Sequence, residues 1–340
     1  MALRFIDSFD HYAIPAGLPY KYNSYNDTTG VNGLGSMTGR RSGSTALAIR
    51  ASADFIGLTF EPQSTWIVGF AYYLYSTETA ELYRFTDSDG NIQLTVQITN
   101  AGLIQLYRGS TSGTLLATST VALTITAWNW IEIKCTIADS GGLFEVRINE
   151  TVYVTYTGDT KQSSTLSTAI RLQLWGRSSD IGIDDYYVCD GIGSTNNNYL
   201  GDIRIDALRP VGAGAYADFS RSAGANNWDN VDEATNDGDT TYNYSSTVGN
   251  KDSFDCANLT ALPASIYGLQ VNLTARKDEA GGRTLKVLQR IASTDYEGVA
   301  LGMPMTYTAL RQIFEVSPAT AAAYTESEIN GAEFGYKVYS

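Results

Sequence analysis

Alternating hydrophobic and polar residues run along most of the chain, and this period of two predicts β-strands. One strand presents an unbroken apolar face made of Trp66, Val68, Phe70, Tyr72 and Leu74. Turn sequences such as residues 87–90 and 139–142 separate the strands at intervals of about 8–12 residues, which is typical of antiparallel sandwiches and barrels. No segment supports an amphipathic helix longer than a turn or two. We therefore predict an all-β fold.

Two apolar strand sequences that contain acidic residues lie at the ends of the first run of strands. They are residues 5–10 and residues 181–188. Such a pair is what a sandwich needs when its first and last strands are neighbours. A linker-like composition without periodicity follows at residues 190–198, and alternation resumes at residues 200–205. We predict two β domains, at residues 1–192 and 199–340.

The end of the chain also contains a helix signal. Thr325 and Glu328 have the spacing of a capping box, which predicts one short helical turn. An alternating segment follows, and we expect a closing strand at residues 332–338.

An acidic composition limits the partners that we expect. The chain has 36 acidic and 23 basic residues and a net charge of −13. Its densest basic spot is Arg40–Arg41, which we interpret as a solvated turn. Such a surface repels phosphate backbones, so no nucleic acid partner is predicted. The sequence contains no run of about 18 apolar residues, so no membrane partner is predicted. Residues 1–5 lack the apolar core of a signal peptide, and we therefore expect the protein to fold in a cytoplasm.

Residues that support catalysis are scarce. The only histidine is His11, so a Ser-His-Asp or Cys-His arrangement would have to include it. Three widely spaced cysteines predict neither a disulfide framework nor a zinc site: Cys135, Cys189 and Cys256. Cys135 shares an apolar strand face and is predicted in the core. The glycine-rich segments 33–35 and 212–214 lack the following helix of a nucleotide site. We predict a non-enzymatic protein without a cofactor.

With its opening strand, central tryptophan-rich strands and closing strand at 181–188, the first domain resembles the concanavalin A-like (laminin-G-like) jelly roll. The whole chain resembles tail, fibre or capsid-decorating proteins of tailed bacteriophages, in which a smaller β domain follows the jelly roll. Segments 200–205, 230–233, 239–242 and 328–335 are those of the second domain that are similar.

This resemblance implies a virion structural protein that is assembled in the host cytoplasm. Its expected partners are other virion proteins, further copies of the same chain in a homo-oligomer, and, as an alternative, glycans of the host surface. A glycan-binding adhesin is therefore the second hypothesis. A divergent glycoside hydrolase is the third, although residues 78–81 do not match the carboxylate spacing of the similar laminarinases.

Acidic residues at the ends of the first and last strands are the candidate metal ligands. Asp7, Asp10, Asp184 and Asp185 would converge if these strands pair, and carboxylate oxygens suit Ca²⁺. The resemblance also implies a structural calcium in this region. Asp184 and Asp185 should point to opposite faces of a strand, so only one would serve the same ion. The alternative is that the carboxylates cap loop amides.

A second acidic stretch is the other calcium candidate, with a solvated loop as its alternative interpretation. It consists of Asp229, Asp232, Glu233, Asp237 and Asp239.

Aromatic residues near loops and strand ends are the candidate glycan contacts, because their rings stack on sugars. They are Tyr22, Tyr25, Trp175 and Trp228. The other three tryptophans, Trp66, Trp128 and Trp130, are predicted in the core.

Overall fold

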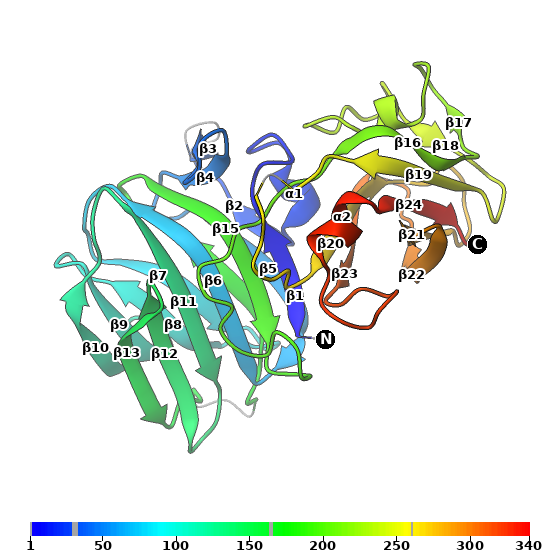
Figure 1. The fold of residues 1–340 in the computed structure, drawn as a ribbon. Helices are drawn as coiled ribbons and strands as arrows, with labels where there is room; N and C mark the ends of the chain where they lie inside the picture. Colours follow the sequence, from blue (N-terminus) through cyan, green and yellow to red (C-terminus); the bar gives the residue numbers. More distant parts are fainter. Residues whose placement is uncertain (1, 29–32, 163–165, 260) are drawn as a thin grey trace. The chain divides into compact units, whose positions relative to one another are not determined.

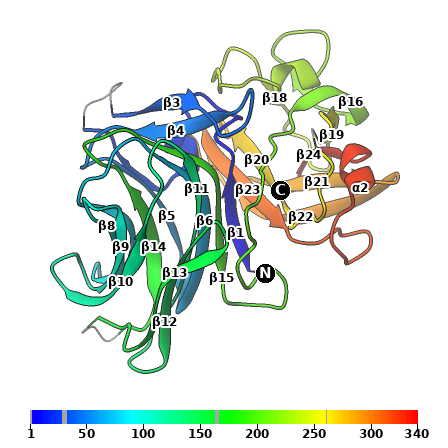
Figure 2. The ribbon, with the colours of Figure 1, turned by 60° about the vertical axis from the view of Figure 1, so that its left-hand side comes forward.

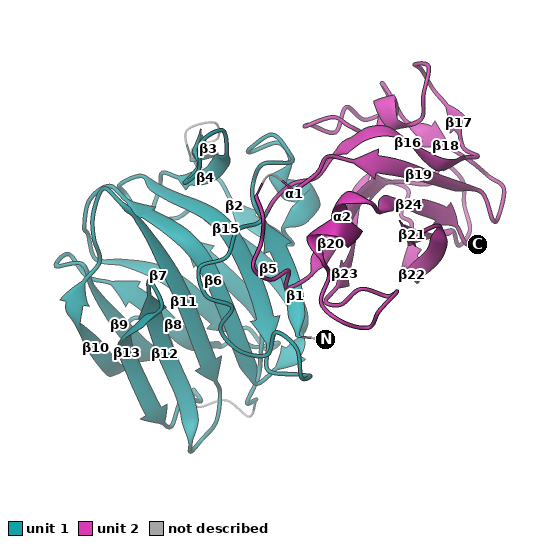
Figure 3. Ribbon diagram, in the orientation of Figure 1, with its two compact units in different colours: residues 1–205 teal, residues 206–340 magenta. Residues whose placement is uncertain are grey.

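The computed structural model describes residues 2–28, 33–162, 166–259 and 261–340. The chain divides into two compact units, Met1–Ile205 and Asp206–Ser340 (Figure 3). Their regular secondary structure is almost wholly antiparallel strand, which confirms the all-β prediction. Within the described ranges, no helix has the length and apolar character needed to cross a membrane.

Unit 1 is a sandwich of two sheets (Figures 1 and 2). The first sheet has the strand order β13-β12-β11-β6-β15-β4-β3, with β1 also paired to β15. Its strands are β1 (Leu3–Asp7), β3 (Leu34–Thr38), β4 (Thr45–Ile49), β6 (Thr65–Leu74), β11 (Trp128–Thr136), β12 (Gly142–Ile148), β13 (Thr151–Gly158) and β15 (Ile181–Asp190). The second sheet has the order β10-β9-β8-β7-β14-β5-β2. Its strands are β2 (Ser24–Asn26), β5 (Phe55–Gln63), β7 (Ala80–Thr86), β8 (Ile92–Ile98), β9 (Leu103–Arg108), β10 (Thr114–Ala122) and β14 (Ala169–Trp175). A single helical turn, α1 (Leu18–Lys21), precedes β2.

The core of unit 1 lies between these two sheets. The apolar face predicted for β6 is fully buried there, and so is Cys135 of β11, which confirms both predictions. The hydroxyls of Tyr83 and Tyr186 are 2.6 Å apart and join the two sheets across the core. The same core contains the stacked rings of Phe70 and Tyr83. Alternate burial along each strand therefore leaves the other residues of that strand on an outer face.

The first and last strands of unit 1 pair with each other, as predicted. β1 is antiparallel to residues 186–189 of β15, and β4 pairs with residues 181–183. Between these two partners, the register of β15 against β6 shifts, and Asp185 has a φ of 49°. This is a β-bulge, which breaks the alternation of side chains along a strand.

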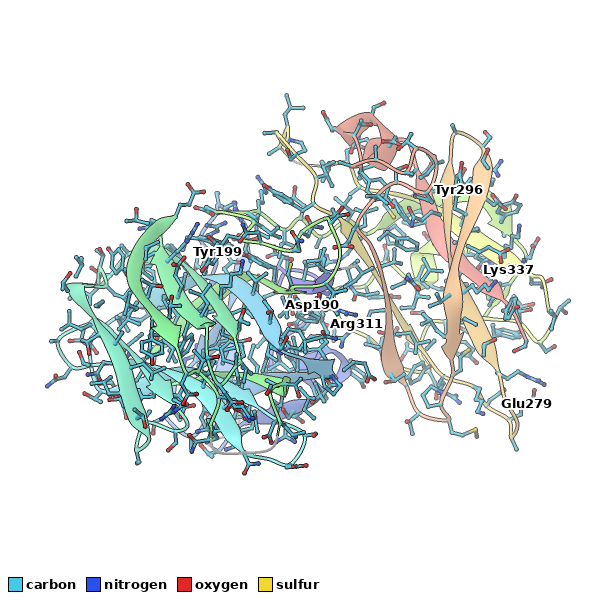
Figure 4. The ribbon with its side chains drawn as sticks, turned by 90° about the horizontal axis from the view of Figure 1, so that it is seen from below. Asp190, Tyr199, Glu279, Tyr296, Arg311 and Lys337 are labelled. Carbon is cyan, nitrogen blue, oxygen red and sulfur yellow. The ribbon has the colours of Figure 1, made fainter. Side chains whose placement is uncertain are left out.

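Residues 198–205, which we call the strap, form no strand and belong to unit 1, so the strand predicted at 200–205 is wrong. The amides of residues 200 and 201 donate to Glu132 Oε1 over 3.1 and 2.9 Å. The amide of Ile205 donates to Asp185 Oδ1 over 2.7 Å, and the hydroxyl of Tyr199 (Figure 4) donates to Glu145. These carboxylates lie on the outer face of the first sheet. They hold the strap there, and the second compact unit starts at Asp206.

Unit 2 has a five-stranded sheet in the order β16-β19-β24-β21-β22. Its strands are β16 (Pro210–Ala217), β19 (Lys251–Cys256), β21 (Thr284–Ile291), β22 (Thr294–Gly302) and β24 (Glu333–Val338). The remaining elements are the pairs β17 (Ser220–Arg221) with β18 (Asn243–Tyr244) and β20 (Leu269–Ala275) with β23 (Thr308–Phe314), the short helix η2 (Trp228–Asn230) and α2 (Glu326–Asn330). Thr325 caps α2 through a capping box with Glu328, and β24 follows, so the predicted helical turn and closing strand are confirmed.

Candidate functional site

On the outer face of the second sheet, three side chains lie in a line along β14, the strand between β7 and β5. Arg171, Gln173 and Trp175 alternate with Leu172 and Leu174, which are buried in the core. Side chains two residues apart on a strand are spaced by roughly 6–7 Å. The line is therefore long enough to contact several groups of an extended ligand.

Neighbouring strands complete this surface, which we call the β14 face. The register places Gln173 between Arg84 of β7 and Gly57 of β5. A Cβ atom at Gly57 would lie 3.1 Å from Gln173 Cγ and 2.5 Å from Ser24 Oγ. Glycine is therefore required at position 57, because both side chains lie over the backbone there. On β7 the face ends at Glu81.

The Trp175 ring is fixed on this face by two neighbours. Its centroid is 4.6 Å from that of Phe55, and the Arg84 guanidinium lies 4.4 Å from the indole ring. Arg84 in turn forms two hydrogen bonds of 2.6 Å with the carboxylate of Glu81. These contacts hold Trp175 on the surface while leaving part of its ring accessible.

Several polar groups of the β14 face have no hydrogen-bond partner among the described residues. Gln173 is only 7% exposed, and its side-chain amide forms no hydrogen bond there. The indole N–H of Trp175 and the hydroxyl of Ser24 are buried and also unpaired. An unpaired buried polar group costs about 1–3 kcal/mol of stability. Of these groups, the amide of Gln173 keeps some exposure and is the one left for a partner from outside.

The four aromatic residues predicted as glycan contacts do not form one site. Trp175 lies on the β14 face. Tyr25 is 44% exposed, but the register pairs it with Ile56, whose side chain points into the core and away from the β14 face. Tyr22 is in the core of unit 1, so its predicted surface position is wrong, and Trp228 lies in η2 of unit 2.

One of the three tryptophans predicted in the core is not buried. Trp66 and Trp130 are buried as predicted, although Trp130 lies on the outer face of the first sheet, between Tyr187 and the Arg40 guanidinium. Trp128 is on the same outer face and is only partly buried, beside Tyr73. The reason is the register of β11, whose core-facing side chains have odd residue numbers.

Sequence reasoning missed the other members of the β14 face. Arg171, Gln173 and Arg84 were not singled out, although polar residues at 171 and 173 alternate with Leu172 and Leu174. That alternation is a signal for an outward strand face. Which outward face has an unpaired amide, however, depends on the neighbouring strands.

The predicted calcium ligand Asp7 is buried and fully bonded. It accepts hydrogen bonds from the hydroxyls of Tyr12 and Tyr22 and from the amide of Phe9, over 2.8–2.9 Å. Lys21 Nζ lies 3.1 Å from the carboxylate. Burial raises the pKa of Asp7, but the charge of Lys21 and these hydrogen bonds lower it below its ordinary value. The carboxylate therefore acts as an anchor between β1 and α1.

Asp184 and Asp185 lie at the bulge of β15, and both contact Arg40. The Arg40 amide donates to Asp184 Oδ2 over 2.8 Å, and Arg40 Nε donates to Asp185 Oδ2 over 2.6 Å. The expectation that they point to opposite faces is wrong because the bulge breaks the alternation. The solvated turn expected at Arg40–Arg41 is also wrong, since the Arg40 side chain is 10% exposed and Arg41 also pairs with Asp185.

Burial has a large effect on Asp184. It raises the pKa of this carboxyl to about 7, and the negative charge of Asp185 contributes in the same direction. The fourth predicted ligand, Asp10, accepts the amide of Thr45 over 2.6 Å, and burial raises its pKa as well. The four carboxylates thus cap backbone amides and pair with cations, as in the alternative interpretation.

We expect chelation to leave the stability of unit 1 unchanged. Across the described ranges, no group of three or more His, Cys, Asp or Glu side chains is placed to hold a metal ion. The oxygens of Asp7 and Asp185 already accept from Lys21, Arg40 and Arg41. Melting with and without excess EDTA tests this, and a lower melting temperature in EDTA would favour the predicted calcium site.

The second acidic stretch, in unit 2, also binds protein groups. Asp239 accepts from Arg276 and from the hydroxyl of Tyr307, and the hydrogen bond from Arg276 lowers the pKa of Asp239. The hydroxyl of Thr241 lies 2.7 Å from Glu233 and 2.6 Å from Asp237 and donates its proton to one of the two carboxylates. Asp229 accepts from Asn226. Asp232, the remaining predicted ligand, is partly exposed.

Comparison with known proteins finds distant structural similarities and no family. No protein-family model matches the chain, and no curated protein matches it. Among solved structures, the cellulose-induced protein Cip1 is 14% identical with a TM-score of 0.41, over 54% of this chain and 96% of that one. A galectin-like protein of unknown function from Bacillus subtilis is 12% identical, with a TM-score of 0.38 and coverage of 56% and 96%. The carbohydrate-binding module CBM66 from Bacillus subtilis is 12% identical, with a TM-score of 0.32 and coverage of 47% and 98%.

At these identities and scores, the similarities decide nothing about a ligand or a role. They also leave untested the predicted virion role, the homo-oligomer and the absence of enzymatic activity, which stay predictions.

Proposed function

We propose that unit 1 is a saccharide-binding module and that its binding site is the β14 face. The observation that carries this proposal is the line of Arg171, Gln173 and Trp175 on one strand. An accessible aromatic ring, an unpaired amide and a guanidinium lie there within the reach of one oligosaccharide.

The chemistry of this line suits a sugar ring. A pyranose has an apolar face that packs against an indole, as Trp175 offers. Its hydroxyls donate and accept hydrogen bonds, as the amide of Gln173 does. Because Phe55 and Arg84 already hold the indole, little freedom is lost when a ligand binds. The polar face continues onto β8 and β9 with Gln97 and Gln105, so longer oligosaccharides should bind more tightly.

Gln173→Leu is the sharpest test of the site. Leucine has a similar size and removes an amide that has no partner in the protein, so the melting temperature should stay equal or rise. Saccharide binding should fall about tenfold or more, because the hydrogen bonds to the ligand are lost. A glycan array with the full-length chain identifies ligands, and calorimetric titration then gives the affinities.

Trp175→Ala should also reduce the affinity about tenfold or more. Its matched control is Trp128→Ala, which removes a partly buried tryptophan from the outer face of the other sheet of unit 1. The proposal is wrong if no saccharide binds, or if Gln173→Leu and Trp128→Ala change the affinity equally.

A further inference from the structure

The guanidinium of Arg171 has no partner within the described residues, where it forms neither a hydrogen bond nor an ion pair. The other arginines on strands of this sheet are paired, Arg84 with Glu81 and Arg108 with Asp159. The chain has 36 acidic and only 23 basic residues. An arginine without a partner is therefore unusual among the strands of this sheet.

The surroundings of Arg171 are suited to an anion. The register places Thr59 of β5 and Thr86 of β7 directly beside it. The Thr86 hydroxyl beside it is buried and has no hydrogen-bond partner among the described residues, so no protein acceptor competes with a ligand for it. Glu61, two residues beyond Thr59 on β5, forms no ion pair with Arg171. One cation and one hydroxyl donor thus lie together at the end of the β14 face.

Arginine is more specific than a general positive charge. Its planar fork of N–H groups matches the two oxygens of a carboxylate and binds them through two parallel hydrogen bonds. Because the overall charge is −13, the protein as a whole repels anions. An acidic ligand therefore needs a local cation such as Arg171, whereas a neutral sugar does not.

We infer that the saccharide bound on the β14 face carries a carboxylate, and that Arg171 binds this group while Gln173 and Trp175 contact the sugar rings. This inference rests on the proposed function of the β14 face. It assigns the ligand to the acidic saccharides, of which uronic acid oligomers are the simplest representatives.

The test compares each acidic oligomer with its own neutral derivative. Short oligomers of galacturonic, glucuronic, mannuronic and guluronic acid are titrated against the full-length chain, each beside its methyl ester. At least one acid should bind roughly 10- to 100-fold more tightly than its ester. Its affinity should fall as salt is added, because the ion pair is screened.

Arg171→Gln should remove the preference for the acid over the ester and leave the melting temperature unchanged. The matched control is Arg50→Gln, which removes a surface arginine that pairs with Asp180 outside the β14 face. This control should keep the full preference for the acid.

The outcomes separate the inference from the proposed function. Equal binding of acid and ester that still depends on Gln173 would retain the β14 face as a saccharide site but overturn the assignment to acidic ligands. If a sulfated oligomer of similar length binds more tightly than every uronate, the inference that Arg171 binds a carboxylate is also overturned. Absence of binding to every acidic, sulfated and neutral saccharide would overturn both proposals.

Discussion

Arg40→Met is expected to lower the free energy of unfolding of unit 1 by about 3 kcal/mol or more. The substitution removes one of the two arginines that pair with the buried carboxylate of Asp185: Arg40 Nε lies 2.6 Å from Oδ2, and Arg41 is the other. It also removes the hydrogen bonds from Arg40 to Asp202 and to the carbonyl of Ile203, which hold the strap. The measurement is denaturant unfolding followed by tryptophan fluorescence, since only Trp228 of the five tryptophans lies in unit 2.

Two further variants distinguish charge pairing from general damage. Arg50→Met removes an arginine that pairs over 3.5 Å with Asp180, which is 53% exposed, so it should cost less than about 1 kcal/mol. Arg40→Met combined with Asp185→Asn should cost less than the sum of the two single substitutions, because both remove the same contact. Asparagine also tolerates the φ of 49° at this position. Equal effects of Arg40→Met and Arg50→Met would contradict the role given to Arg40.

Asp184→Asn is expected to stabilise unit 1 in a strongly pH-dependent way. Burial, together with the charge of Asp185, raises the pKa of Asp184 to about 7, above its ordinary value of 3.8. The folded protein therefore binds this proton more tightly than the unfolded chain does. The stability that the group contributes is complete below about pH 4 and is lost as the pH rises through 7. Asparagine remains neutral at every pH and so avoids this loss; its oxygen still accepts the Arg40 amide, but its NH2 group gives up the hydrogen bond from the Asp185 amide, a cost that does not change with pH.

The advantage of the variant over the wild type should therefore grow by about 3 kcal/mol between pH 5 and pH 8. The buried carboxylate of Asp7, whose pKa is lowered, is present in both proteins and cancels in the difference. Unfolding curves at several pH values give the measurement. Asp89→Asn, at an exposed turn, serves as the control and should show no such trend. A constant difference between wild type and Asp184→Asn would contradict a buried, protonated carboxyl.

The candidate sites differ in how far sequence could predict them. The convergence of Asp7, Asp10 and Asp184 followed from one assumption, that the first and last strands pair, and their shared region is confirmed. Their partners did not follow. Arg40 lies more than 140 positions from Asp184, and no local pattern distinguishes a buried arginine from one on a solvated turn.

The β14 face shows the same division at a finer scale. Trp175 was singled out from sequence, since an aromatic residue at a strand end is a visible feature. Arg171 and Gln173 become notable only when β5 and β7 are in place, because only then is it clear that neither side chain has a partner.

Sequence alone determined the all-β class and the capped turn before β24, because alternation and capping depend on residues close together in the chain. The pairing of the first and last strands was an assumption, which the structure confirms. Tertiary structure alone decided that residues 198–205 form a strap, that the bulge turns Asp184 and Asp185 toward Arg40, and that Gln173 is left unpaired. Each of these depends on contacts between distant strands. The register of those strands is a property of the whole sheet and cannot be predicted from any one segment.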